Sequence, residues 1–127
     1  MLQEEFLMKN QITPRYWREV YKSAEKRKIE LNLTEDEAWE VFLQQEEHCF
    51  FSGLHLDFDS RGYRGSASLD RVNSLKDYSK DNIQWVFCPY NGMKGGHNNK
   101  YFIHLCDLVT KNQGLKPDQL WIPDESN

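Results

Sequence analysis

The alternation of hydrophobic and polar positions predicts an amphipathic helix that begins at Thr13-Pro14. A threonine hydroxyl caps a first helical turn well, and proline at the first helical position loses no hydrogen bond. Apolar residues recur at helical spacing and are expected to face the core: Trp17, Val20, Tyr21 and Ala24. Basic residues recur on the other side: Arg15, Arg18, Lys22 and Lys26. The pattern therefore predicts one helix with a basic stripe.

A second helix is predicted to start at Thr34, after a polar break at Asn32-Leu33. Thr34 and Glu37 have the spacing of a capping box, with further acids at the positive end of the helix dipole. Its apolar side is formed by Ala38, Trp39, Val41 and Phe42. The helix is expected to end near Glu47.

The middle of the chain reads as strands followed by a helix. Residues 48–58 form two short β-prone pieces around a turn at Gly53, and residues 57–66 form a polar loop. Apolar runs then predict strands over 67–72 and 83–87, separated by a second polar loop. A helix follows from Pro89 and is interrupted at Gly95-Gly96.

The last third contains one more predicted helix, over residues 101–110, and a tail over 111–127. One face of this helix is apolar and includes Cys106, which we expect to be a small core residue. The tail is polar except for Leu120-Trp121-Ile122, a triplet that is expected to pack against the body.

Length and composition indicate one globular domain over residues 1–127. The chain is 39% hydrophobic and 28% charged, and no apolar run approaches the roughly 20 residues of a membrane span. Acids precede the short apolar run at the N-terminus, unlike in a secretory signal. Three widely spaced cysteines favour a reducing compartment over a disulfide framework. We expect a cytoplasmic protein without membrane association, and the sequence leaves monomer and homodimer open.

Charge is segregated along the chain, although the net charge is −4. Residues 9–28 hold seven basic and two acidic residues, a net charge of +5. Residues 61–100 hold seven basic and three acidic residues, a net charge of +4, whereas residues 34–47 hold six acids and no base. This distribution favours one phosphate-facing surface and an acidic back. DNA is the expected partner, contacted by Arg15, Arg18, Lys22, Lys26 and Arg64.

Four polar residues lie where the predicted strands and helix meet: Asp70, Arg71, Asn82 and Asn91. The ordered runs SLDRVNS, DNIQW and NGMK that contain them resemble the HNH endonucleases, in particular small phage and mobile-element enzymes with an "LDR" form of the motif. The resemblance covers roughly residues 13–110. It implies an α+β fold with helices over 13–47, a ββα-metal core over 48–96 and a C-terminal helix.

The resemblance implies a metal-dependent DNA endonuclease or nickase that hydrolyses phosphodiester bonds. Asp70 and Asn91 would hold one divalent cation over the scissile phosphate, with Mg²⁺ expected and Mn²⁺ as a substitute. Carboxylate and amide oxygens are ligands that such hard cations prefer. Asn82 would brace the loop through hydrogen bonds to backbone. Lys94, one turn past Asn91, would meet a phosphate oxygen.

The residue after Asp70 departs from most HNH enzymes, which carry a histidine general base there. Arg71 does not accept a proton at working pH, so we expect it to act as a transition-state clamp. The base must then come from elsewhere, and the candidates are His48, His55, Tyr63 and His97. We favour His55, because its segment is expected to pair beside the hairpin and a histidine has a suitable pKa.

Cys49 is followed by Ser52 where related nucleases carry a second cysteine, and Cys88 has no neighbouring partner, so we predict no structural zinc site.

The missing histidine also leaves an alternative function open: a DNA-binding module that keeps the HNH scaffold but is catalytically impaired. A third interpretation is an interaction protein whose basic stripe is merely solvated.

Overall fold

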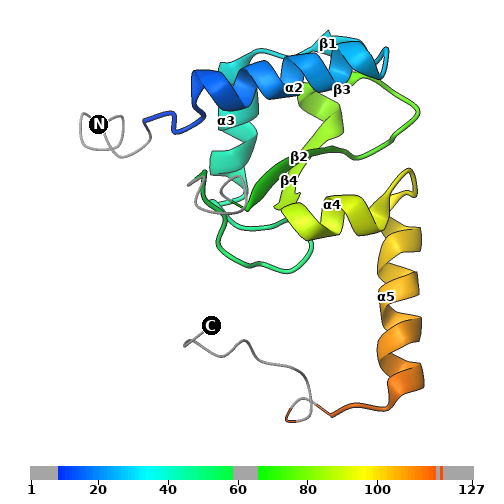
Figure 1. Ribbon diagram of the computed structural model, residues 1–127. Helices are drawn as coiled ribbons and strands as arrows, with labels where there is room; N and C mark the ends of the chain where they lie inside the picture. The colour runs from blue at the N-terminus through cyan, green and yellow to red at the C-terminus, as the bar shows by residue number, and fades with distance from the viewer. Residues whose placement is uncertain (1–8, 59–65, 117, 119–127) are drawn as a thin grey trace.

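The centre of the fold is an antiparallel strand pair followed directly by a short helix (Figure 1). The computed structural model describes residues 9–58, 66–116 and 118. Strand β2 (Ala67–Arg71) pairs with β4 (Ile83–Phe87), so that Leu69 lies opposite Trp85. Helix α4 (Cys88–Lys94) follows β4 without a loop, with Pro89 in its first turn, and ends at Gly95, whose φ is +56°. The predicted strand–strand–helix order is confirmed.

Two capped helices precede this centre. Helix α2 (Pro14–Lys26) begins where Thr13 Oγ1 accepts a hydrogen bond from Tyr16 N at 3.0 Å. Helix α3 (Glu35–Gln44) has the expected capping box, in which Thr34 and Glu37 exchange hydrogen bonds. Both caps confirm the predicted helix starts. Helix α3 ends at Gln44, three residues before the end predicted near Glu47.

A small parallel sheet lies beside the helices and has no counterpart in the sequence predictions. Strand β1 (Leu31–Asn32) pairs with β3 (Tyr78–Ser79), and the 3-10 turn η1 (Lys80–Asn82) leads into β4. The Lys80 ammonium pairs with Glu40 of α3, which raises the pKa of Lys80. These contacts tie the connection between α2 and α3 to the loop between β2 and β4.

Aromatic rings fill the core between the helices and the strand pair. The Trp85 ring is fully buried and contacts the rings of Phe42 and Phe58 at centroid distances of 5.7 and 5.2 Å. Its indole N–H donates to Ala38 O at 2.8 Å, so burying the ring leaves no unpaired donor. This packing fixes β4, and with it the position of α4.

Residues 48–57 form a compact loop rather than two strands. His48 and His55 make an isolated antiparallel bridge, and Gly53 occupies the left-handed region that its turn requires, with φ of +76°. A backbone bond from Phe50 N to Trp85 O places this loop alongside β4. The expected pairing beside the hairpin is therefore limited, on the β4 side, to this single backbone hydrogen bond.

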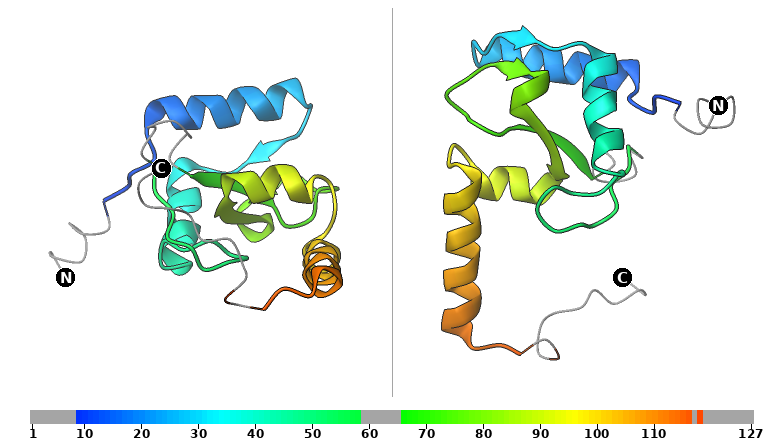
Figure 2. Two further views of the ribbon diagram at one scale, coloured as in Figure 1. Left: turned by 60° about the horizontal axis from the view of Figure 1, so that its bottom comes forward. Right: turned by 180° about the vertical axis from the view of Figure 1, so that it is seen from behind.

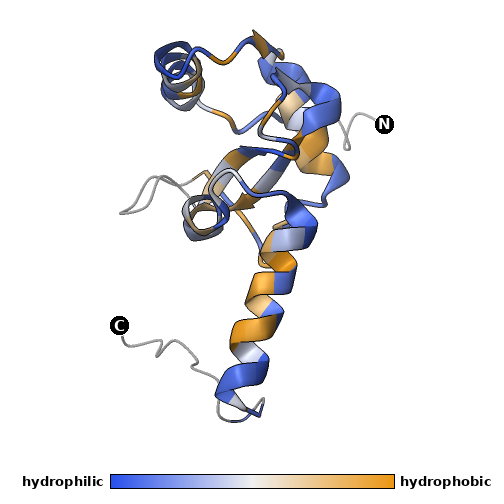
Figure 3. Cartoon of the chain, turned by 90° about the vertical axis from the view of Figure 1, so that its right-hand side faces the viewer, coloured by the Kyte–Doolittle hydropathy of each residue, from blue (hydrophilic) through white to orange (hydrophobic). Residues whose placement is uncertain are grey.

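Helix α5 (Asn99–Gln113) projects from the rest of the molecule (Figures 1 and 2). Only Phe102 is buried, against Phe51, and Figure 3 shows apolar bands that continue along the projecting part. Cys106 is exposed, which corrects its expected place in the core, because the body covers only the start of the helix. Tyr21 of α2, at 55% exposure, also lies outside the core.

Two expectations lie outside the described residues: the packing of the triplet 120–122 and the structure of most of the loop 57–66. In the described part of the chain, no helix is long and apolar enough to cross a membrane.

Candidate metal and nucleic-acid site

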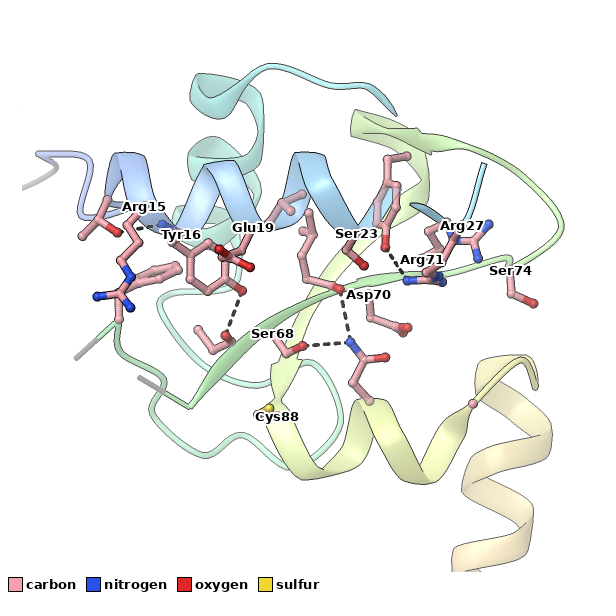
Figure 4. A pocket seen from close by; sticks show the side chains of 18 residues that line it. Arg15, Tyr16, Glu19, Ser23, Arg27, Ser68, Asp70, Arg71, Ser74 and Cys88 are labelled. Carbon is pink, nitrogen blue, oxygen red and sulfur yellow. Dashed lines mark hydrogen bonds between the residues drawn. The ribbon is translucent and has the colours of Figure 1, made fainter. Parts of the chain in front are cut away.

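A cleft of about 880 Å³ separates α2 from the surface formed by β2 and α4 (Figure 4). Helix α2 and its C-cap residue Arg27 supply one wall, which also includes Arg15 and Glu19. The other wall includes Asp70 and Arg71 at the end of β2. Three further positions of that wall are Ser68, Ser74 and Asn91. The structure thus brings three of the predicted site residues, Asp70, Arg71 and Asn91, to one cavity.

Asp70 is held rigidly at the base of this cleft. Only 6% of the residue is exposed, and its Oδ2 atom accepts hydrogen bonds from Gln84 Nε2 at 2.8 Å and Lys94 Nζ at 2.7 Å. No hydrogen bond from the described residues reaches Oδ1. Every fully buried polar side-chain atom of these residues has a partner, so Oδ1 keeps some exposure toward the cleft that Asp70 lines. One carboxylate oxygen is therefore anchored, and the other is open to a ligand.

In Asn91 too, one side-chain atom makes hydrogen bonds within the protein and the other is open. Its Nδ2 donates to Ser68 Oγ at 2.8 Å and to Leu69 O at 3.2 Å, which ties α4 to β2. These two bonds use the nitrogen and orient the amide, while the Oδ1 atom accepts none from the described residues. Asn91 therefore presents a neutral oxygen in the same cleft as the anionic oxygen of Asp70.

Asn82 is buried beneath the loop that joins β2 to β4 and does not line the cleft. Its Oδ1 accepts from Asn73 N at 2.9 Å, and its Nδ2 donates to Asn73 O at 3.0 Å and to Asp77 O at 2.8 Å. These are the backbone contacts that we expect of a loop brace. Asn82 thereby shapes the chain that follows Asp70 and Arg71.

Arg71 lines the cleft, and part of its guanidinium group makes contacts within the protein. One N–H group donates to Lys76 O at 2.7 Å, and the group lies 5.4 Å from the centre of the Tyr78 ring. Arg27 approaches the same tyrosine from α2, with 3.4 Å between its Nη1 and the Tyr78 hydroxyl. Two arginines from opposite walls thus converge near Tyr78 (Figure 4).

The position of Lys94 differs from the expected one. The residue has 0% exposure, and its ammonium group is bound by Asp70 Oδ2 and by Arg71 O, the latter at 2.8 Å. Spacing along α4 places Lys94 on the same side as Asn91, and that side faces β2 rather than solvent. Its expected role as a phosphate contact is therefore corrected: Lys94 is a buried partner of Asp70.

The structure also corrects the choice of His55 as the base. His55 is exposed, its ring lies 5.8 Å from that of His48, and neither ring lines the cleft. The reason is local: residues 48–57 fold back on themselves through backbone bonds such as Leu56 N to Glu47 O. His97 is also exposed, against Tyr101, while Tyr63 and Arg64 lie outside the described residues.

The basic stripe on α2 is exposed, as predicted, and only one of its members lines the cleft. Arg15 lines the cleft, but Arg18, Lys22 and Lys26 are exposed without lining it. The cleft-facing positions are instead Arg15, Tyr16, Glu19, Val20, Ser23 and Arg27. Their three- and four-residue spacing was available in the sequence, but it does not reveal which side of a helix faces a cavity.

Sequence reasoning also missed a polar network behind Asp70. Gln84 of β4 links Asp70 to Asn99 at the start of α5, and the two amides exchange hydrogen bonds of 2.9 and 2.8 Å. A glutamine within an otherwise apolar strand run was the available signal, because a buried amide requires partners. The network connects β2, β4, α4 and α5 at the cleft.

The donor set fits a hard divalent cation bound weakly. Asp70 Oδ1 and Asn91 Oδ1 are oxygen ligands of the preferred kind, and two protein ligands leave positions for phosphate and water. Within the described ranges, no group of three or more His, Cys, Asp or Glu side chains is arranged to hold a metal ion. Cys49 is buried, and its sulfur accepts a hydrogen bond from Phe87 N at 3.3 Å.

The site lies on an antiparallel strand pair followed by a helix, with an acid on strand β2 and an amide on helix α4. Among solved structures, the fold is similar to that of the rare-cutting HNH restriction endonuclease PacI, with a TM-score of 0.56. The match covers 79% of this chain and 80% of that chain at 21% identity. No protein-family model and no curated protein matches the sequence. The chain therefore has an HNH-type α+β fold.

Proposed function

We propose that this protein is a divalent-metal-dependent DNA endonuclease or nickase. The observation that carries the proposal is the cleft itself. It presents the open oxygens of Asp70 and Asn91 on one wall and two arginines, Arg15 of α2 and its C-cap residue Arg27, on the facing wall. Oxygen ligands suit a hard cation, and arginines suit the phosphates of a nucleic acid. The fold shared with an HNH restriction endonuclease supports the same assignment.

In this proposal Asp70 and Asn91 hold the cation, for which Mg²⁺ is the expected ion and Mn²⁺ a substitute. The bound ion supplies charge stabilisation to the phosphate and the leaving 3′ oxygen. Arg71 offsets negative charge on the phosphate. Asn82 keeps the loop after Arg71 in place, and Arg15 and Arg27 bind neighbouring phosphates.

One observation favours a second candidate, a DNA-binding module with impaired catalysis. No histidine of the described residues lines the cleft, and Asp70 is already paired with Lys94. A module of this kind would bind DNA with the salt dependence of phosphate contacts but would not cleave it.

A supercoiled-plasmid assay with Mg²⁺, Mn²⁺ and EDTA separates the two candidates. The endonuclease assignment predicts conversion to open-circle or linear DNA with either ion and none with EDTA. Salt-sensitive binding without conversion under any ion would select the impaired module. The Asp70→Ala variant requires a check of folding by circular dichroism, because it leaves the buried Lys94 charge unpaired. The exposed Asp107→Ala is the matched control.

A further inference from the structure

The buried ion pair between Lys94 and Asp70 is an unusual feature for a candidate metal site. The two side chains are 1% and 7% exposed, and the nitrogen lies 2.7 Å from Asp70 Oδ2. Lys94 also donates to Arg71 O, and the same Oδ2 accepts from Gln84. A lysine is rarely buried this completely unless its charge is compensated. Here the compensating charge is Asp70, the only anionic ligand that the proposed metal site has among the described residues.

This pairing has a consequence for metal binding. In the free protein, one negative charge is balanced by one positive charge, so the base of the cleft is close to neutral. A divalent cation at Asp70 Oδ1 would add two positive charges beside a buried ammonium group. Like charges at short range in a partly desolvated site repel strongly. A phosphodiester in the cleft supplies the negative charge that offsets this repulsion.

We propose that Lys94 is a positioning residue that makes metal binding at Asp70 depend on a bound DNA phosphate. The inference rests on the proposed function, because it uses Asp70 and Asn91 as the metal ligands. Lys94 fixes Oδ2 and lowers the affinity of the free protein for metal. The site then binds its ion together with DNA, and the protein holds little metal without a substrate.

The test measures Mn²⁺ binding without DNA, by the loss of the free-ion electron paramagnetic resonance signal. Lys94→Met removes the competing charge and keeps a long apolar chain, so it should bind Mn²⁺ at least about tenfold more tightly than the wild type. Lys94→Arg keeps the charge and should bind as weakly as the wild type. The double variant D70N/K94M has neither charge and should not bind, which assigns the tighter binding to Asp70.

Thermal unfolding gives a second readout that a purely structural role would not produce. Mn²⁺ should raise the melting temperature of Lys94→Met more than that of the wild type, because the ion replaces the missing positive charge beside Asp70. If Lys94→Met is unfolded in metal-free buffer, recovery of its helical circular dichroism by Mn²⁺ supports the proposal, and no recovery contradicts it.

The outcomes distinguish this inference from the proposed function. Equal or weaker Mn²⁺ binding by folded Lys94→Met would overturn the role of Lys94, even if the wild type cleaves a plasmid with Mg²⁺. Failure of the wild type to bind Mn²⁺ more tightly with a duplex oligonucleotide would also overturn it. Loss of the proposed function itself would appear separately, as a wild type that binds DNA but does not cleave it with any ion.

Discussion

Replacing Asn82 with alanine removes the three hydrogen bonds that brace the loop between β2 and β4. The side chain accepts from Asn73 N and donates to Asn73 O and Asp77 O, at distances of 2.8 to 3.0 Å. Each such bond contributes roughly 1 kcal/mol, and water reaches part of the half-buried loop once the amide is gone. We therefore expect Asn82→Ala to lower the free energy of unfolding by about 2–3 kcal/mol.

Urea denaturation followed by circular dichroism measures this change. With a slope of about 1.5 kcal/mol per molar urea for a domain of this size, the midpoint should fall by roughly 1.5 M. The exposed Asn112→Ala on α5 is the matched control and should leave the midpoint nearly unchanged. Asn82→Asp should also be destabilised, because a carboxylate would face two carbonyl oxygens. A midpoint for Asn82→Ala within about 0.3 M of the wild type would refute the bracing role.

Two further predictions concern the cleft. Arg15→Ala and Arg27→Ala should each reduce the slope of log DNA affinity against log salt concentration by about 0.9, because each removes one phosphate contact. Arg18→Ala should change this slope less. An equal reduction for Arg18→Ala would place DNA on the outer side of α2. Glu19→Gln removes a negative charge from the cleft wall. It should tighten DNA binding, measured by fluorescence anisotropy, about three- to tenfold. Unchanged affinity would exclude DNA from this wall.

The helix starts and the strand–strand–helix order were predictable because each has a local cause. Thr13 and Thr34 cap helices through bonds to residues three positions on, and apolar runs over 67–72 and 83–87 indicate strands that contribute to the core. The β1–β3 pair was missed because two-residue strands leave too short a pattern to detect.

The site could be predicted only for residues whose side-chain chemistry and position along the chain both fit a metal site. Asp70 and Asn91 were singled out because they lie where the predicted strands and helix meet, and the resemblance to HNH endonucleases assigned them as ligands; both line one cleft. Lys94 and His55 were misplaced because the sequence does not reveal which side of a short helix or loop is covered by other elements. Cys106 illustrates the same limit: helical periodicity identified an apolar face of α5, but the body covers only Phe102 at its start.

The assignment of the cleft as a metal-dependent nuclease site can be tested by the rate of plasmid nicking by Asn91→Ala, compared with that of the wild type in Mg²⁺. Among the described residues, the Asn91 side chain makes hydrogen bonds only through its nitrogen, to Ser68 Oγ and Leu69 O. Alanine therefore removes the proposed metal ligand without leaving a buried charge. Metal assistance contributes several kcal/mol, so the rate should fall about a thousandfold while DNA affinity stays within about tenfold. A near wild-type rate for folded Asn91→Ala would contradict the assignment of this cleft as the metal-dependent nuclease site.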